Sequence, residues 1–524
     1  MRVVRFSCLL LAAPLVLRAQ TAPERSGYYM LSGKDTIFAE RSTRTATELS
    51  GEMLDRVRGS RITYRATLSP NGLVTQMETR IFATSGDTVG RKGTLHFEGD
   101  SVVADMGGGV VRLSTLSGAM LFVNGSSAFM EQVVLHARAI GLLQSTVVYP
   151  IFVTSVAQTT PLTVTFIGKD SATIDFGNVS ARLAISPSGR FLSGAVPAQN
   201  ITIVRADDVR LTAPDRYAAP GGAPYTAEGV EVRTPAGLRF TGTLTIPRGG
   251  ASGRAPAIVT ITGSGPEDRD EESMALPGYR PFRELADTLG RRGIAVLRLD
   301  DRGVGGSDAG PLTATTADFA NDIRAAVAYL RTRSEIDVAR IGLVGHSEGA
   351  IIAPMVASAD PGIRAIVSMA GNASTGREIV AEQNRYLIDS VARLQGAVRD
   401  STMARALRSA DSLASERAWE TFFFAYDPSV VARRVRTPVL ILHGETDRQI
   451  ALSEATKLGA AFRSGGNTGV TVRTFPETNH LFVADPSGAF RDAAGTLAYA
   501  SLPSLRVRRE VLGAIADWLS VQLK

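Results

Sequence analysis

Residues 341–350 read Ile-Gly-Leu-Val-Gly-His-Ser-Glu-Gly-Ala. An apolar run leads into a Gly-x-Ser-x-Gly pattern, and the small residues of 350–357 after it are compatible with a helix. In a turn between a strand and a helix, this pattern predicts that Ser347 is held in a strained conformation with its hydroxyl pointing out of the sheet. Gly345 and Gly349 stand where a Cβ atom would clash with neighbouring backbone. We therefore predict a nucleophilic Ser347; the alternative is an ordinary strand-to-helix turn.

A serine hydroxyl needs a base within hydrogen-bond reach, and the base needs an orienting carboxylate. His480 follows the last predicted strand, in the loop 475–482, and is the candidate base. The carboxylate is expected in the loop after the preceding strand, residues 444–450. Asp447 is the first choice there and Glu445 the second, and the alternative for either is a solvated loop carboxylate.

The other four histidines are expected to have different roles. His346 is adjacent to Ser347, so its side chain must point elsewhere. His443 ends a predicted strand and is expected to be packed or to serve as a hydrogen-bond partner. His96 and His136 are isolated in the N-terminal region and are interpreted as structural.

Attack on a carbonyl group builds negative charge on oxygen, which fixed N–H donors must meet. The N–H of Glu348 lies at the start of the predicted helix and is one candidate. The other is expected in the loop 263–271, Gly-Ser-Gly-Pro-Glu-Asp-Arg-Asp-Glu, where Gly265 is favoured over Ser264 because glycines let the backbone approach a substrate. The charged run 267–272 is interpreted as a solvated loop held by local ion pairs, with metal binding as the less favoured alternative.

Composition limits the class of protein. A chain of 524 residues is expected to form two or three domains. Its 44% hydrophobic and 21% charged residues are typical of a globular protein. The net charge of +6 is small and the basic residues are scattered, so a nucleic-acid partner is not indicated. Cys8 is the single cysteine, which argues against disulfides, cysteine-ligated metals and a cysteine nucleophile.

The first residues have the pattern of a secretory signal peptide. Two arginines within residues 1–5 precede an apolar run over 6–17, and small and polar residues follow. We expect a signal peptide over residues 1–20, with cleavage between Ala19 and Ala22, and export to the periplasm or the extracellular space. The alternative is a buried N-terminal helix or strand. No other run is long and apolar enough to predict a membrane helix.

Residues 27–205 show short β-type runs separated by turn signals, such as 61–68 followed by Ser-Pro-Asn-Gly. This spacing predicts an antiparallel sandwich, barrel or curved sheet. Residues 126–143 are expected to form a helix. A stretch rich in Pro, Gly and Ala over 213–225 predicts a linker, with bounds 206–226.

From residue 227 a β-hairpin leads into alternating strands and helices. Apolar strands are expected at 257–262, 294–299, 341–344, 365–369, 439–443 and 470–474, and helices at about 281–292, 316–333, 347–358, 451–462 and 505–522. Such alternation predicts the α/β class, with a mostly parallel sheet covered on both faces.

The gap 372–436 is too long for a simple crossover and predicts a helical cap insertion. It carries an aromatic group, namely Trp419, Phe422, Phe423, Phe424 and Tyr426. This group either packs the insertion on the sheet domain or lines an acyl pocket, and the two interpretations are compatible.

Taken together, residues 227–524 resemble the α/β-hydrolase superfamily. The matching motifs are Gly-His-Ser-Glu-Gly at 345–349, Asp-Arg-Gly-Val-Gly-Gly-Ser at 301–307, Gly444 with Asp447, and Asn479-His480. More narrowly, the Gly-Ser-Gly-Pro loop resembles that of bacterial carboxylesterases related to acylaminoacyl peptidases, where other members have His-Gly. The resemblance implies a triad of Ser347, Asp447 and His480, hydrolysis of short-chain acyl esters, an extra N-terminal region and no cofactor.

The leading hypothesis is an exported serine esterase acting on a small-molecule ester. One alternative is an aminoacyl or oligopeptide peptidase; those usually carry a β-propeller, for which about 180 residues without a blade repeat are too few. Another is a surface-binding protein in which 27–205 attaches to a glycan or an envelope partner and the hydrolase is accessory. The natural substrate, the role of the N-terminal region and the oligomeric state stay open.

Overall fold

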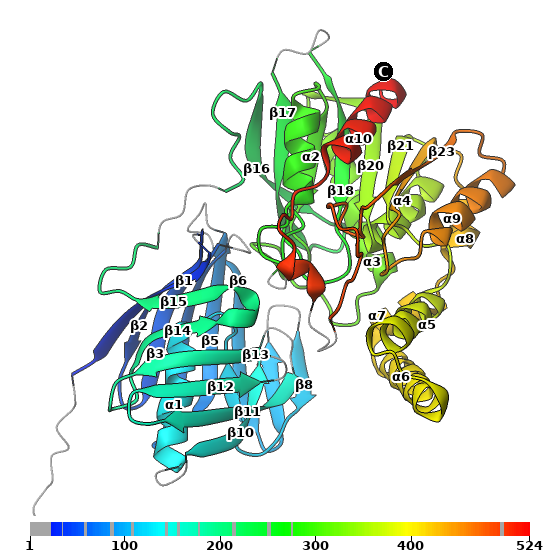
Figure 1. Ribbon diagram of the computed structural model, residues 1–524. Helices are drawn as coiled ribbons and strands as arrows, with labels where there is room; N and C mark the ends of the chain where they lie inside the picture. The colour runs from blue at the N-terminus through cyan, green and yellow to red at the C-terminus, as the bar shows by residue number, and fades with distance from the viewer. Residues whose placement is uncertain are drawn as a thin grey trace, which may run out of the picture.

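The computed structural model describes residues 22–524, apart from residues 34, 57–59, 84–88, 106–108, 142–144, 155–157, 177–178, 212–215, 249–252, 274–275 and 493–496. The predicted signal peptide therefore lies outside the described residues, as does part of the predicted linker. The described chain forms two sheets, which occupy separate lobes (Figure 1).

The first sheet has fifteen described strands, in the order β8-β7-β6-β5-β4-β3-β2-β1-β15-β14-β13-β12-β11-β10-β9. Burial alternates along strands such as β4, because successive side chains point to opposite faces. Neighbouring strands pair antiparallel except β9 and β10, which pair in parallel. The bounds are β1 Glu24–Ser32, β2 Asp35–Arg44, β3 Glu48–Asp55, β4 Ser60–Leu68, β5 Val74–Ala83, β6 Val89–Glu98, β7 Ser101–Asp105, β8 Val110–Ser114, β9 Met120–Phe122, β10 Thr146–Val153, β11 Gln158–Ile167, β12 Ser171–Phe176, β13 Val179–Ile185, β14 Phe191–Val196 and β15 Ile201–Arg205, with a 3-10 turn at Pro197–Gln199.

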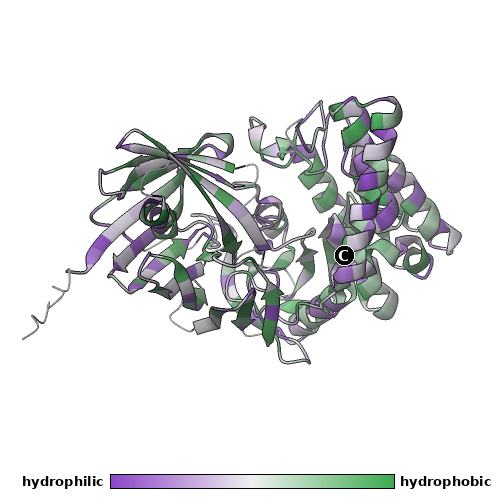
Figure 2. Ribbon diagram, turned by 90° about the horizontal axis from the view of Figure 1, so that it is seen from below, coloured by the Kyte–Doolittle hydropathy of each residue, from purple (hydrophilic) through white to green (hydrophobic). Residues whose placement is uncertain are grey.

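Helix α1 (Ser127–Ile140) connects β9 to β10 and lies within the curve of this sheet (Figure 2). Most of its residues are buried. The carboxylate of Glu40 on β2 accepts a hydrogen bond from the N–H of Ala128 at 3.0 Å, so that strand and helix are joined at the positive end of the helix. Of the three predicted β architectures, the first lobe is therefore a curved sheet, and the helix predicted over 126–143 is present.

The second sheet has eight described strands, in the order β16-β17-β19-β18-β20-β21-β22-β23. The strands β16, β17 and β19 pair antiparallel, and β19, β18, β20, β21, β22 and β23 pair in parallel. Every residue of β19 and β22 is buried, as expected of strands covered on both faces. The bounds are β16 Tyr225–Arg233, β17 Arg239–Pro247, β18 Ala255–Ile261, β19 Ala295–Leu299, β20 Ile336–His346, β21 Ile363–Met369, β22 Val439–Gly444 and β23 Val470–Phe475.

Helices cover both faces of the second sheet. The helices α2 (Pro281–Gly290) and α10 (Arg509–Gln522) share one apolar core with it. The helices α3 (Thr316–Arg331), α4 (Glu348–Ala359) and α9 (Ser453–Ser464) share the other. A short 3-10 helix at Ala498–Ser501 precedes α10. We propose that the two sheets with their helices are two domains, joined by the segment between β15 and β16.

The insertion between β21 and β22 is helical, as predicted. It contains α5 (Gly376–Tyr386), a π-helical turn at Leu387–Val391, α6 (Gly396–Glu416), α7 (Ala418–Ala425) and α8 (Pro428–Ala432). The helices α5, α6 and α7 lie together to one side of the sheet (Figure 1). We call α5 to α7 the cap.

The structure confirms the predicted fold class: an α/β domain with a mostly parallel sheet and a helical insertion, preceded by a β-rich region. The helix that differs most from its predicted bounds is α10, which begins at Arg509 and not at about residue 505. Arg508 is extended there, since its N–H donates to Phe482 O at 2.9 Å and its guanidinium to Pro476 O at 2.6 Å. Among the described residues, no helix combines the length and apolar character needed to cross a membrane.

Candidate active site

The turn between β20 and α4 places Ser347 at the carboxyl edge of the sheet. Its backbone has φ +52° and ψ −114°, a conformation that L-residues rarely adopt. A Cβ atom on Gly345 would overlap the carbonyl oxygen of Gly349, and one on Gly349 would overlap that of Ile261. The two glycines are thus required by the close approach of backbone, and Ser347 is only half-buried at the tip of the turn.

Three side chains predicted from the sequence meet at this turn. His480 Nε2 lies 3.2 Å from Ser347 Oγ, and His480 Nδ1 lies 2.8 Å from Asp447 Oδ2. With the ring proton on Nδ1, the Ser347 hydroxyl donates to His480 and His480 donates to Asp447. The structure therefore brings the three together in hydrogen-bonding order, and their catalytic role stays a prediction.

Asp447 and His480 are both buried. Burial lowers the pKa of His480 below its ordinary value, although Asp447 opposes this. Burial alone would raise the pKa of Asp447, but His480, His443 and the N–H of Ile450 outweigh it and hold that pKa below its ordinary value. The pair is thus a neutral imidazole beside a carboxylate, which is the form that accepts a proton from serine.

The second-choice carboxylate and the remaining histidines lie elsewhere. Glu445 is exposed and accepts from Thr474 Oγ1 at 2.7 Å. His443 is buried, with Nε2 at 2.9 Å from Ile450 O. In the first domain, His96 faces Glu98 at 3.0 Å and His136 Nδ1 lies 2.8 Å from Asn71 O, both structural contacts.

His346 makes contacts that the sequence did not suggest. Its Nδ1 lies 2.5 Å from Glu271 Oε1, and its Nε2 lies 2.9 Å from the backbone oxygen of His480. Burial works against a charged His346, but Glu271 and the His480 carbonyl overcome it and raise the pKa above its ordinary value. His346, the residue before Ser347, therefore holds the backbone of His480, whose ring faces Ser347.

The loop after β18 lies beside the elbow and carries the candidate oxyanion donors. The N–H of Gly263 is engaged by Glu267 Oε2 at 3.1 Å and Glu271 Oε1 at 3.2 Å, so it does not face a substrate. Within the described part of the chain, the N–H groups of Ser264 and Gly265 have no hydrogen-bond acceptor, and Gly265 adopts φ +119°. The choice between these two donors stays open, and Glu348 N–H is placed at the start of α4, where helix N–H groups lack intrahelical acceptors.

A cavity of about 450 Å³ opens between this loop, α3, α4 and the cap. Its walls include the candidate oxyanion residues Ser264, Gly265 and Glu348. Most of its surface is apolar, from Phe240, Leu299, Phe319, Ile323, Ile352 and the cap residue Trp419. The packing interpretation of the aromatic group holds for Phe422 and Tyr426, which lie against the core of the sheet domain. Trp419 lines this cavity, and its use as an acyl pocket stays a prediction.

The prediction that residues 267–272 form a solvated loop is wrong. Asp268 to Glu272 are buried, at 0 to 7% exposure. Arg269 binds both carboxylate oxygens of Asp300, at 3.0 and 2.6 Å, and its remaining donors reach Gly242 O and Thr243 Oγ1 at 2.7 and 2.8 Å. The charges are tolerated inside because arginines from elsewhere in the fold pair with them, which the local sequence does not reveal.

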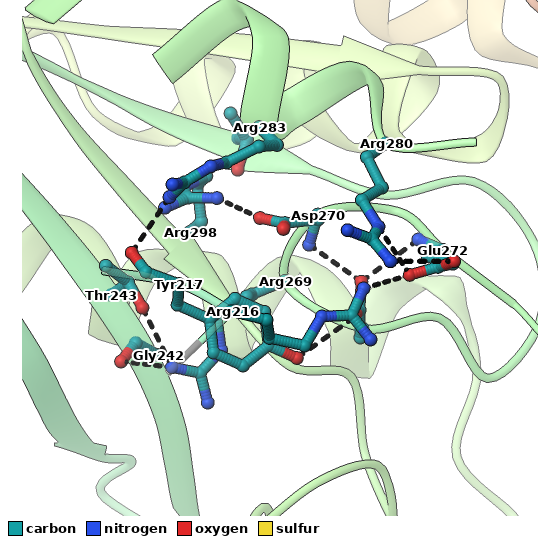
Figure 3. Close-up of polar contacts among 12 residues, drawn as sticks. Arg216, Tyr217, Gly242, Thr243, Arg269, Asp270, Glu272, Arg280, Arg283 and Arg298 are labelled. Atoms are coloured by element: carbon teal, nitrogen blue, oxygen red, sulfur yellow. Dashed lines mark hydrogen bonds and ion pairs between the residues drawn. The ribbon is translucent and has the colours of Figure 1, made fainter. Parts of the chain in front are cut away.

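The same loop is tied to the segment that joins the two domains (Figure 3). Arg216 pairs with Asp268 at 3.3 Å and with Glu272, and it also donates to the backbone oxygen of Arg56 in the first domain. The hydroxyl of Tyr217 donates to Asp268 at 3.0 Å, and its ring lies 4.1 Å under the Arg269 guanidinium. The loop that carries the candidate oxyanion donors is therefore bound by both the sheet and the segment between β15 and β16.

A second buried arginine completes this network. Arg298 on β19 is fully buried and pairs with Asp270. Burial, with Arg269 nearby, lowers the pKa of Arg298 to about 10. Despite the many carboxylates, no group of three or more His, Cys, Asp or Glu side chains in the described ranges is arranged to hold a metal ion.

The sequence around this site is similar to those of known hydrolases. Residues 279–487, which contain Ser347, Asp447 and His480, match the family described as serine aminopeptidase, S33. The chain is similar to Esterase EstD of Thermotoga maritima, at 29% identity over 257 residues, 46% of this chain and 58% of that esterase. It is also similar to a thiohydrolase of Arthrinium phaeospermum, at 31% identity over 144 residues, 27% of this chain and 42% of that enzyme. The chain thus spans less than two thirds of either relative.

Two solved structures resemble part of the chain distantly. An esterase of Pyrococcus furiosus matches with a TM-score of 0.40 and 15% identity, covering 58% of this chain and 94% of that one. The hydrolase GrgF from a Penicillium species matches with a TM-score of 0.39 and 16% identity, covering 57% of this chain and 99% of that one. Likenesses at this level say nothing about the substrate.

Proposed function

From the premise that this chain is an α/β-hydrolase related to esterases, we propose that it is a serine hydrolase that cleaves carboxylic esters of small molecules. The observation that carries the proposal is the hydrogen-bonded series from Ser347 through His480 to Asp447, at 3.2 and 2.8 Å. The similarity to Esterase EstD favours an ester over a peptide bond as the target.

In the first half of the reaction, Ser347 Oγ attacks the ester carbonyl carbon while His480 Nε2 takes the hydroxyl proton. The carbonyl oxygen becomes an oxyanion, which the N–H of Glu348 and that of Ser264 or Gly265 stabilise. When the tetrahedral intermediate collapses, the bond to the alcohol breaks and His480 gives its proton to the leaving oxygen. The acyl group is now an ester of Ser347.

In the second half, water attacks this acyl-enzyme. His480 takes a proton from the water as its oxygen bonds to the carbonyl carbon, and then returns the proton to Ser347 Oγ as the carboxylic acid leaves. Asp447 orients the imidazole throughout and stabilises its cationic form. No redox step or cofactor is needed for this sequence.

Labelling with a fluorophosphonate probe tests the proposal. We expect one covalent adduct on the peptide that contains Ser347, identified by mass spectrometry, and hydrolysis of p-nitrophenyl butyrate that the probe abolishes. A peptidase is the second candidate, because the matched family is described as a serine aminopeptidase. An aminoacyl-naphthylamide turned over with a higher kcat/KM than the butyrate ester would favour the peptidase and contradict the esterase.

We further propose that the acyl group is short or of moderate length and enters the cavity of about 450 Å³ beside the elbow. The apolar walls favour a neutral hydrocarbon chain, since burial of apolar surface contributes about 25 cal/mol per Å². A series of p-nitrophenyl esters of increasing chain length is the measurement that defines the limit.

The pH dependence of kcat/KM is expected to follow His480. Only neutral imidazole accepts the serine proton, so kcat/KM for an uncharged ester falls as the pH decreases through the pKa of His480 in the free enzyme. Because burial lowers this pKa, we expect the midpoint of the acidic limb below the ordinary histidine value of 6.5. Initial rates measured across that value check the prediction, and a midpoint above 6.5 would contradict it.

We also propose that the protein is exported. The support is the sequence pattern of residues 1–20, with its arginines and apolar run. Expression of the full chain in a bacterium, followed by mass analysis of the periplasmic fraction, should recover a product that begins between Ala19 and Ala22. Intact chain confined to the cytoplasm would contradict export.

A further inference from the structure

The side chain of Glu348 has surroundings that the reaction does not require. This residue follows Ser347 directly, begins α4 and is 4% exposed. The mechanism uses only its backbone N–H. A carboxylate buried next to a developing oxyanion is unfavourable for catalysis, so its presence calls for a separate explanation.

Glu348 accepts hydrogen bonds from different segments of the domain. Its Oε1 lies 2.6 Å from Thr316 Oγ1 on α3 and 2.8 Å from Trp419 Nε1 on α7. Burial raises the pKa of this carboxyl, and the polar contacts around it oppose the rise. One buried group therefore joins the turn at Ser347 to α3 and to the cap.

Helix α7 packs on the sheet domain through Phe422, which stacks on Tyr426 and not on the indole of Trp419. None of the residues of α7 is fully buried. Trp419 stacks on Phe423 within the same helix, with ring centroids 5.0 Å apart and planes 9° apart, so that contact does not fix α7 to the sheet domain. The hydrogen bond from the indole N–H to Glu348 ties Trp419 itself to the sheet domain and holds the ring against the cavity.

We propose that Glu348 is a positioning residue that fixes Trp419 as a wall of the acyl cavity, and that this bond limits the size of the acyl group accepted. The proposal rests on the proposed esterase function for its substrate readout. The acyl group is neutral and apolar, because the wall it meets is made of Phe319, Ile323, Ile352 and the indole ring. Loss of the bond lets the indole ring leave the cavity wall, which admits longer acyl chains.

The substitutions Trp419→Phe and Glu348→Ala test this together: the first removes the N–H donor but also shortens the ring, and the second removes the acceptor and leaves the indole intact. We measure the ratio of kcat/KM for p-nitrophenyl octanoate to that for p-nitrophenyl butyrate. The ratio is expected to rise by about fivefold to tenfold, within the range that a few methylene groups contribute in an apolar pocket. Glu348→Ala should raise it similarly, whereas Glu348→Gln, which keeps an acceptor oxygen, should leave it near that of the parent.

Thr316→Val is the matched control. It removes the other donor to the same oxygen, from α3 rather than from the cap. Its selectivity ratio should stay within about twofold of the parent, a difference of about 0.4 kcal/mol or less. An equal rise in Thr316→Val, or an unchanged ratio in both Trp419→Phe and Glu348→Ala, would overturn the proposal.

A second readout does not depend on catalysis. The chain has two tryptophans, so in a Trp518→Phe background Trp419 is the single indole reporter. Glu348→Ala should then shift the emission to longer wavelength as the ring becomes more exposed, while Glu348→Gln and Thr316→Val should not. If the fluorophosphonate does not label Ser347 but Glu348→Ala still shifts the emission, the esterase proposal is rejected and the role of Glu348 in positioning Trp419 is kept. If the probe labels Ser347 but Glu348→Ala does not shift the emission, only the positioning role is rejected.

Discussion

Replacing Ser347 with alanine is expected to lower kcat for a p-nitrophenyl ester by about 10⁴-fold or more. The variant keeps the fold but has no oxygen to attack the carbonyl, so only the oxyanion donors and binding remain. His480→Ala should cause a loss of similar size, and the double variant should be no worse than either single one, because the two residues act in the same step. Steady-state rates and fluorophosphonate labelling on the three variants measure this.

Ser358→Ala is the control for that series. Ser358 lies on the same helix, α4, and its hydroxyl donates to Met355 O at 3.0 Å, away from His480. Its activity should stay within about twofold of the parent, since surface changes remote from a site have small effects. If Ser347→Ala retained most of the ester hydrolysis, the proposed nucleophile would be wrong.

Replacing Arg269 with methionine is expected to have the largest effect on stability. Arg269 is 7% exposed and its partner Asp300 is 1% exposed, so the substitution leaves an unpaired charge inside the domain. Breaking a buried ion pair in this way costs about 3–5 kcal/mol of unfolding free energy. For a domain of this size the thermal midpoint should fall by roughly 6–20 °C, as followed by calorimetry on the full chain.

Arg377→Met supplies the comparison for Arg269. Arg377 binds Asp411 through both oxygens at 2.9 Å, the same bidentate geometry, but the two side chains are 57% and 48% exposed. Solvent screens such a pair, so its thermal midpoint should match that of the parent. Equal midpoints for the two variants would mean that burial of the 267–272 loop does not stabilise the domain.

The alternation of strands and helices from residue 227 onward can be predicted from the sequence, because apolar runs and turn residues are local patterns. The apolar runs at 341–344 and 439–443 are strands in the structure, and the order of Ser347, Asp447 and His480 along the chain placed all three at one edge of a parallel sheet. Gly345 and Gly349 predict the tight turn, because a Cβ atom at either position would overlap neighbouring backbone.

The prediction for the charged run 267–272 is wrong because its stabilising contacts are not local. All six residues of 267–272 are acidic or basic, and such a run ordinarily stays in water. Their partners Arg216, Arg298 and Asp300 are distant in the sequence, and only folding brings them near. The contact of His346 with Glu271 also could not be predicted from the sequence, because the two residues are 75 positions apart.

By itself, the sequence determined the fold class, the nucleophile turn and the candidate residues Ser347, Asp447 and His480, because propensity, periodicity and backbone sterics act over a few residues. The tertiary structure alone decided which charges are buried, how the oxyanion loop is supported and that Glu348 reaches Trp419 in the cap. Those contacts join segments 30 to 70 or more residues apart, and a buried charge is stabilised only by the partner that the completed fold supplies.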